Sequence, residues 1–193
     1  MSQINILGIP GSIRKNSYNK LLLKATLNLL PNNAKMEIFE DLQLIPPFNQ
    51  DEENNPPEIV KELKKKIREA DAIIFATPEY NRSIPGVLKN LIDWVTRPYG
   101  DNPFDGKVVG IMSASIGMLG GSLAHYHLVQ IMEYLNARIV NQPEVFVSFA
   151  QQKFDENGNL NDEMAKKFIR ILLERIVEEV LLVRSKKELT VTT

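Results

Sequence analysis

Residues 4–19 read INILGIPGSIRKNSYN, a short apolar run that leads through a polar loop into a helical pattern. The run Ile4–Ile9 is rich in isoleucine, which is typical of a strand buried on both faces. Ser17 or Asn19 is placed to cap the helix that the pattern predicts over Lys20–Leu30. A strand that passes through a short loop into a helix indicates an α/β protein.

The same alternation continues along the chain. Further strands are predicted at Lys35–Phe39, Ala72–Thr77, Val108–Ser113 and Val145–Phe149. Helices are predicted at Glu58–Glu69, Gly86–Thr96, Gly121–Asn136 and Asp162–Arg184, the last with Asn161 as its cap. This order predicts a single flavodoxin-like domain over residues 1–184, with a five-stranded parallel sheet of order 2-1-3-4-5 and helices on both faces. Residues 185–193 are expected to form a frayed tail.

Composition limits the classes of function. A formal net charge of -1 argues against a nucleic-acid partner, which usually meets a clustered basic excess. The chain has no cysteine, so redox chemistry requires a bound cofactor. No leader pattern opens the sequence, and no apolar run approaches the ~20 residues of a membrane span. We therefore expect a cytoplasmic protein without a membrane partner.

Three loops are expected to meet beyond the carboxyl ends of the strands, where open α/β sheets bind ligands. They are Gly8–Asn19, Thr77–Gly86 and Ser113–Ser122. The first offers hydroxyls, backbone N–H groups and a guanidinium at a helix N-terminus, which suits a phosphate. Its spacing matches neither a Walker loop nor the dinucleotide fingerprint, and a capped turn explains the same residues.

The other two loops suit a flat ring. Tyr80 offers a surface for a ring to pack against, and Asn81 can donate and accept at the edge of a heterocycle. The glycines of the third loop allow a backbone to approach a ring closely. Ordinary turn chemistry explains each loop alone, but together they fit FMN, which has one terminal phosphate and one flat redox ring.

These loops resemble the signatures of the NADPH-dependent FMN reductases, a flavodoxin-like family that includes quinone, chromate and azo-dye reductases. The first signature, Gly-Ser-x-Arg-x-x-Ser-x-Asn, stands at Gly11–Asn19. The second, Pro-Glu-Tyr-Asn followed by Ser-x-Pro-Gly-x-Leu-Lys-Asn-x-x-Asp-Trp, stands at Pro78–Asn81 and Ser83–Trp94. The resemblance extends over residues 3–180, and the paired signature is more specific than either half.

The resemblance implies which residues bind FMN. Those expected to hold the phosphate are Ser12, Arg14, Ser17 and Asn19, and Tyr18 in the same loop is also expected to bind the cofactor. Those expected to line the isoalloxazine ring are Pro78, Glu79, Tyr80 and Asn81, with Ser113, Ser115 and Gly117 closing the other side. The resemblance also implies a homodimer or homotetramer, with the helix that carries Leu88 and Trp94 near the subunit contact.

The expected activity is that of an NAD(P)H-dependent oxidoreductase. NAD(P)H would pass a hydride through bound FMN to a quinone, an azo compound, a metal oxyanion or free flavin. No catalytic side chain and no metal are expected, because the flavin carries the chemistry. A flavodoxin-like electron carrier, an FMN-binding sensor and a flavin-free hydrolase or nucleotide-binding regulator remain as alternatives, although the near-neutral charge disfavours the carrier.

Other conspicuous residues have ordinary explanations. His125 and His127 lie two apart on a predicted helix, so they do not share a face, and we expect them at a surface or an interface. Asp93 and Trp94 resemble a catalytic pair, but capping, packing or a subunit contact explains them better. For Glu79, a structural hydrogen bond through its backbone is as plausible as an effect on the flavin.

Overall fold

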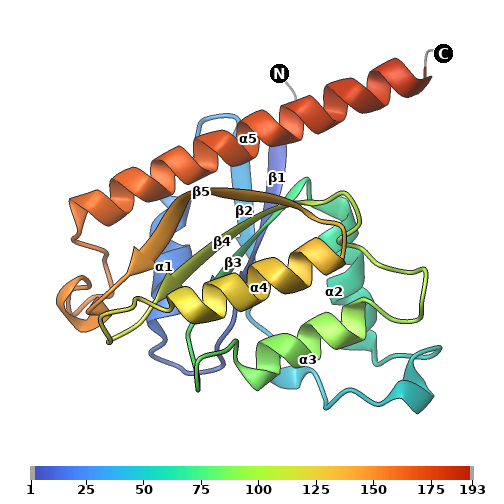
Figure 1. Ribbon diagram of the computed structural model, residues 1–193, viewed down its shortest axis with the longest axis horizontal. Helices are drawn as coiled ribbons and strands as arrows, with labels where there is room; N and C mark the ends of the chain where they lie inside the picture. Colours follow the sequence, from blue (N-terminus) through green and yellow to red (C-terminus); the bar gives the residue numbers. More distant parts are fainter. Residues whose placement is uncertain (1–2, 192–193) are drawn as a thin grey trace.

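The computed structural model describes residues 3–191, and it confirms the flavodoxin-like architecture (Figure 1). Within those residues, the strands form one parallel sheet in the order β2-β1-β3-β4-β5. The strands are β1 (Ile4–Pro10), β2 (Ala34–Ile38), β3 (Ala72–Thr77), β4 (Val108–Ala114) and β5 (Arg138–Val147). The strand order reverses between β1 and β3, so a switch point lies at the carboxyl ends of these two strands.

Helices cover both faces of the sheet. They are α1 (Tyr18–Leu27), α2 (Glu58–Glu69), α3 (Gly86–Val95), α4 (Ser122–Tyr134) and α5 (Glu163–Val191). The apolar faces of α2, α3 and α4 pack in one core, whereas those of α1 and α5 pack in the other. No helix within residues 3–191 is long and apolar enough to cross a bilayer.

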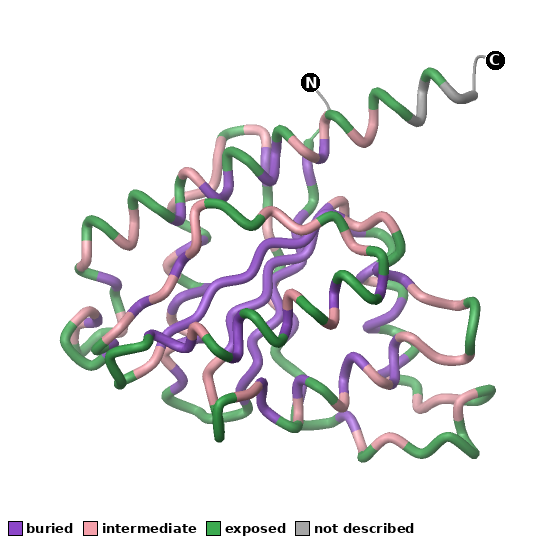
Figure 2. The backbone as a smooth tube through the Cα atoms, viewed as in Figure 1, coloured by how far each residue is buried: buried purple, intermediate pink, exposed green. Residues whose placement is uncertain are grey.

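Alternation along the central strands builds the two cores. Ile73 and Phe75 of β3 face α2, α3 and α4, while Ile74 and Ala76 face α1 and α5. Because both faces are covered, every residue of β3 and β4 is buried (Figure 2). This double coverage explains why the central strands read as continuous apolar runs in the sequence.

Several predicted boundaries are wrong in the carboxyl-terminal part of the chain. The strand expected to begin at Val145 begins at Arg138, because β5 is an edge strand whose first half is partly exposed and has no apolar run. The last helix is capped by Asp162 rather than by Asn161, since Asp162 Oδ1 accepts a hydrogen bond from the backbone N–H of Ala165 at 2.8 Å.

The long helix α5 also continues beyond its expected end at Arg184, as far as Val191, and extends past the sheet (Figure 1). Residues 192–193 of the expected tail lie outside the described residues. The fraying of this tail and the assignment of residues 1–184 to one domain stay predictions.

Candidate functional site

The loop after β1 gathers groups that donate hydrogen bonds. Ser17 stands at the N-cap of α1 with an extended backbone, and its side chain makes no capping bond to any described residue. Ser12 is also buried, and its Oγ accepts from the backbone N–H of Arg14 at 3.2 Å. The Arg14 guanidinium lies over the same loop and donates to the Asn16 carbonyl at 2.9 Å. Two hydroxyls, a guanidinium and a helix N-terminus in one short loop form a set that suits a phosphate.

The loop after β3 presents an aromatic ring on a tight turn. The backbone N–H of Tyr80 donates to the Ser83 carbonyl at 3.0 Å, and the N–H of Ser83 donates back at 3.1 Å. Between them, Asn81 and Arg82 have left-handed φ values of 51° and 66°. This geometry is that of a two-residue hairpin, and it leaves the Tyr80 side chain 48% exposed.

The loop after β4 is ordered by its own hydroxyls. The buried Ser113 donates its Oγ–H to the Gly120 carbonyl at 2.7 Å. Ser115 Oγ accepts from the backbone N–H of Gly117 at 3.2 Å. Gly120 and Gly121 have positive φ values of 61° and 90°. These contacts fold the loop into an exposed ridge that ends at the start of α4.

The structure brings the three loops together. A Cβ added at Gly11 would lie only 3.1 Å from the Cα of Thr77. A Cβ at Gly121 would lie 2.8 Å from the Cβ of Ser113 and 3.6 Å from the Thr77 carbonyl oxygen. Thr77 is buried, and its Oγ1 donates to the Pro78 carbonyl at 2.9 Å. The first and third loops therefore meet around the end of β3, and glycine is what allows this approach.

Two of the expected binding residues have their side chains engaged inside the protein. Asn19 donates its Nδ2–H to the Ala114 carbonyl and accepts from the Ala114 N–H through Oδ1, both at 2.9 Å. Ser113 donates to Gly120. These side chains therefore connect the loops to one another, and their contact with a cofactor stays a prediction.

Three other residues that were expected to bind the cofactor lie in surroundings that differ from one another. The Tyr18 ring packs against Phe154, with 5.6 Å between the ring centroids. Asn81 is exposed on the hairpin turn. Glu79 makes a structural hydrogen bond through its side chain rather than its backbone, because Oε2 accepts from the backbone N–H of Leu123 at 3.0 Å.

A fourth loop, which follows β5, was missed from the sequence. The N–H of Phe149 donates to the Gly117 carbonyl at 3.3 Å, and the N–H of Ala150 donates to the Ser115 carbonyl at 3.0 Å. Phe149 has a left-handed φ of 50°. The apolar residues of Val145–Phe149 predicted a strand over the whole segment, so the turn at Phe149 was not expected. This loop supports the glycine-rich loop from the side of β5.

The prediction that His125 lies at a surface is wrong. Its side chain is buried, 4% exposed, and packs edge to face against Tyr126 and Phe146, with centroid distances of 5.7 and 4.9 Å. Burial lowers the pKa of His125 to about 4, against the opposing charge of Glu144. Among the described residues, its Nδ1 has no hydrogen-bond partner. The folded protein therefore holds His125 neutral.

This neutral histidine predicts a loss of stability in acid. Because the folded pKa is below the ordinary value of 6.5, the unfolded chain binds the proton first, and stability falls as pH decreases from 6.5 to about 4. We expect His125 to account for about 3 kcal/mol of the free energy of unfolding lost over this range. Urea unfolding of the wild type and of His125→Phe at several pH values measures it. An unchanged difference between the two proteins across this range would contradict the assignment.

His127 and Asp93 make local contacts. His127 Nδ1 lies 3.1 Å from Ser83 Oγ, which connects α4 to the hairpin after β3. Asp93 forms an ion pair with Lys89 one turn earlier in α3. Within residues 3–191, no group of three or more His, Asp or Glu side chains is placed to hold a metal ion.

Leu88 and Trp94 face the core rather than a partner. Both side chains are buried. Trp94 Nε1 donates to the Pro46 carbonyl at 2.8 Å, and its ring meets Phe48 edge to face at 5.1 Å. Packing is therefore the role of Trp94, and any subunit contact of α3 must use other side chains.

The strand order and the three loops at its switch point define a flavodoxin-like protein with a site suited to a flavin phosphate and ring. The chain belongs to the family of NADPH-dependent FMN reductases, whose family model matches residues 4–152. This membership confirms the resemblance read from the two signatures, and with it the class of FMN-dependent oxidoreductases.

Relatives cover nearly the whole chain. The sequence is 42% identical over 174 residues to an NAD(P)H-dependent FMN reductase of Pseudomonas aeruginosa, covering 90% of this chain and 93% of the relative. It is 43% identical over 176 residues to an NAD(P)H:quinone oxidoreductase of Solanum tuberosum, covering 88% and 89%. The solved structure of FerB, a flavoenzyme NAD(P)H:(acceptor) oxidoreductase of Paracoccus denitrificans, superimposes with a TM-score of 0.83 at 32% identity, covering 92% and 97%.

Proposed function

We propose that this chain is an FMN-dependent reductase that uses NAD(P)H to reduce quinones and similar small acceptors. The observation that carries the proposal is the meeting of three loops at the carboxyl ends of the strands. One loop carries donors for a phosphate, and another carries an exposed aromatic ring. Quinones are proposed as acceptors because a relative of this chain is an NAD(P)H:quinone oxidoreductase.

The chain's own residues would bind and orient the cofactor. Ser12, Arg14 and Ser17 would hold the phosphate at the N-terminus of α1. Residues proposed to line the ring are Pro78, Tyr80 and Asn81 on one side and Ser115 and Gly117 on the other. Bound FMN would supply the two-electron chemistry, so the polypeptide needs no general base.

Exposed apolar side chains surround the proposed site. Ile116 and Met118 on the ridge after β4 are 64% and 72% exposed, and Tyr80 lies on the facing hairpin. Such a surface suits a flat, weakly polar acceptor and excludes water from it on binding. We propose the cytoplasm as the compartment, since NAD(P)H is available there.

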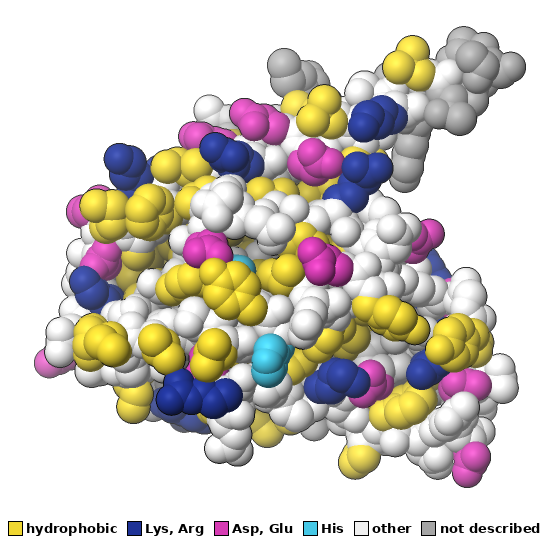
Figure 3. Space-filling model, viewed as in Figure 1, with side chains coloured by type: hydrophobic (Ala, Val, Ile, Leu, Met, Phe, Trp, Pro, Cys, Tyr) yellow, Lys and Arg dark blue, Asp and Glu magenta, His cyan; other side chains and the backbone are white. Residues whose placement is uncertain are grey.

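We propose that the chain forms a homo-oligomer through a groove between α3 and α4. The groove has a volume of about 670 Å³ and includes Ile92 and Ile131. Tyr99 and Tyr134 are exposed beside it, and the Arg97 guanidinium lies 4.6 Å above the Tyr99 ring. Aromatic and arginine side chains at an apolar groove are typical of subunit interfaces. Figure 3 shows hydrophobic side chains gathered over α3 and α4 on this face of the molecule, with Lys and Arg side chains among them. Sedimentation velocity would measure the oligomeric state, and a monomer would contradict this proposal.

The proposed function is tested by reconstituting the purified protein with FMN. We expect flavin absorbance bands that bleach when NADPH is added without oxygen and that return when a benzoquinone is added. A colourless protein with no FMN-dependent oxidation of NADPH would overturn the proposal. A one-electron carrier would instead accumulate a stable semiquinone during photoreduction.

Arg14→Ala should weaken FMN binding by roughly 10–100-fold. Removing a guanidinium from a phosphate loses a charge-assisted contact of about 1.5–3 kcal/mol. Arg14→Lys keeps the charge but not the paired donors, so we expect an intermediate loss. Arg138→Ala is the control. Arg138 pairs with Glu179 at the amino-terminal end of the strands, whereas the three loops lie at the carboxyl-terminal end. Titration of the apoprotein with FMN measures all three, and equal affinities would contradict the phosphate role of Arg14.

A further inference from the structure

The helix α4 begins without a capping side chain of its own. Its N-cap residue is Gly121, held at a φ of 90°. A carboxylate from the loop after β3 takes this place, since Glu79 Oε2 accepts from the N–H of Leu123 at 3.0 Å and of Ala124 at 3.4 Å. A negative charge at a helix N-terminus is favoured by the helix dipole, and the hydrogen bonds are charge-assisted.

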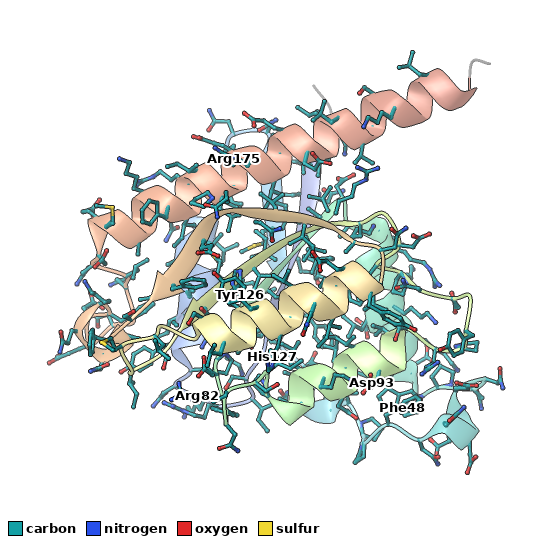
Figure 4. All side chains as sticks on the ribbon, viewed as in Figure 1. Phe48, Arg82, Asp93, Tyr126, His127 and Arg175 are labelled. Carbon is teal, nitrogen blue, oxygen red and sulfur yellow. The ribbon has the colours of Figure 1, made fainter. Side chains whose placement is uncertain are left out.

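The second oxygen of this carboxylate reaches the hairpin. Glu79 Oε1 lies 3.5 Å from Arg82 Nη1, and Arg82 is one of the two left-handed residues of the turn. The Glu79 side chain is only 12% exposed, so its partners surround it. Ser83 at the end of the turn also contacts His127 on α4. Figure 4 shows Arg82 and His127 on these neighbouring elements, so the hairpin is attached to α4 at two points.

These contacts connect two sides of the proposed flavin site. Glu79 directly precedes Tyr80, the aromatic residue of the hairpin, whereas α4 directly follows the glycine-rich loop after β4. The length of the Glu79 side chain therefore sets how far the hairpin stands from the glycine-rich loop. Since one oxygen faces α4 and the other faces Arg82, this carboxylate is directed at protein groups.

We infer that Glu79 is a positioning residue for FMN. It holds the Tyr80 hairpin at a fixed distance from the glycine-rich loop, so that the two enclose the ring. This inference rests on the proposed function, because it takes the space between these loops as the place of the ring. A residue that only stabilised α4 would affect folding and leave FMN binding unchanged.

A matched control separates these two roles. Asp162 is also a carboxylate that accepts a backbone N–H at the start of a helix, that of α5, and pairs with a cation, Lys153. Its side chain is 16% exposed, close to the value for Glu79. We expect Glu79→Ala and Asp162→Ala to lower the melting temperature of the apoprotein by similar amounts. Only Glu79→Ala should raise the Kd for FMN, by about tenfold or more, because the hairpin is no longer held in place before the ring binds.

The experiment is FMN titration by fluorescence quenching, with the visible circular dichroism of the bound flavin as a second readout. At saturating FMN, the dichroism of Glu79→Ala should differ from that of the wild type, and Glu79→Gln should restore most of it, because its amide oxygen still accepts from Leu123. Should Glu79→Ala fail to fold, Glu79→Gln still tests the inference through a smaller rise in Kd. Equal Kd values and dichroism for wild type, Glu79 variants and Asp162→Ala would overturn the positioning role. A wild-type protein that does not bind FMN would overturn the proposed function itself.

Discussion

Replacing Gly121 with valine should destabilise the protein by about 4 kcal/mol and abolish tight FMN binding. Gly121 has a φ of 90°, a conformation that costs a β-branched residue about 1–3 kcal/mol. An added Cβ would also stand 2.8 Å from the Cβ of Ser113, on the fully buried strand β4. Overpacking at such a site costs a further 1–3 kcal/mol or so, because β4 cannot shift without disturbing its two neighbours. The same displacement would move the start of α4 and the ridge before it.

Gly86→Val is the control for this variant. Gly86 is the first residue of α3, and a Cβ there would meet nothing within 4 Å. We expect its free energy of unfolding to stay within about 0.5 kcal/mol of the wild type, since valine and glycine differ little in helix propensity. Urea unfolding and FMN titration of both variants measure the contrast. A Gly121→Val protein as stable as Gly86→Val would show that the loop after β4 rearranges freely.

The strand order was predictable because it depends on patterns that are local in the sequence. The runs at Ile4–Ile9 and Ala72–Thr77 are mostly apolar because helices cover both faces of the sheet, and this coverage leaves few topologies. The edge strand β5 was harder to locate, since its partly exposed first half carries Arg138, Asn141 and Gln142. An edge strand is recognised by its pairing with β4, which no local pattern reveals.

The meeting of the three loops was predictable from the sequence, and the contacts of their individual residues were less so. The signatures marked Asn19 and Glu79, and the glycine-rich loop added Ser113, yet the side chains of these three bind the protein's own backbone. The partners of Asn19 and Glu79, which are Ala114 and Leu123, are distant in sequence, so spacing alone does not separate a side chain that holds a ligand from one that holds the loop. A motif of this kind includes both the contacts to a cofactor and the contacts that shape its site.

Replacing Trp94 with alanine should cost about 3–5 kcal/mol of folding free energy and leave the chemistry intact. Its ring is buried against Phe48, so truncation leaves a large cavity beneath the loop that follows β2. The Pro46 carbonyl would also lose the Nε1–H donor, although Asn90 still donates to it at 2.8 Å. A smaller loss of about 1–2 kcal/mol is expected for Trp94→Phe, which keeps one aromatic ring in the core and removes the Nε1–H donor.

The kcat of the Trp94→Phe variant distinguishes a packing role of Trp94 from a catalytic role. Trp94 donates to the Pro46 carbonyl, which belongs to none of the three loops, and Asp93 is engaged with Lys89. The folded, FMN-loaded Trp94→Phe enzyme should therefore reduce a quinone with an unchanged kcat. It should nevertheless unfold at a lower urea concentration than the wild type. Urea unfolding followed by turnover assays on the same preparation tests both statements. A large fall in kcat without a fall in stability would mean that Trp94 takes part in the reaction, in contradiction to its buried packing against Phe48.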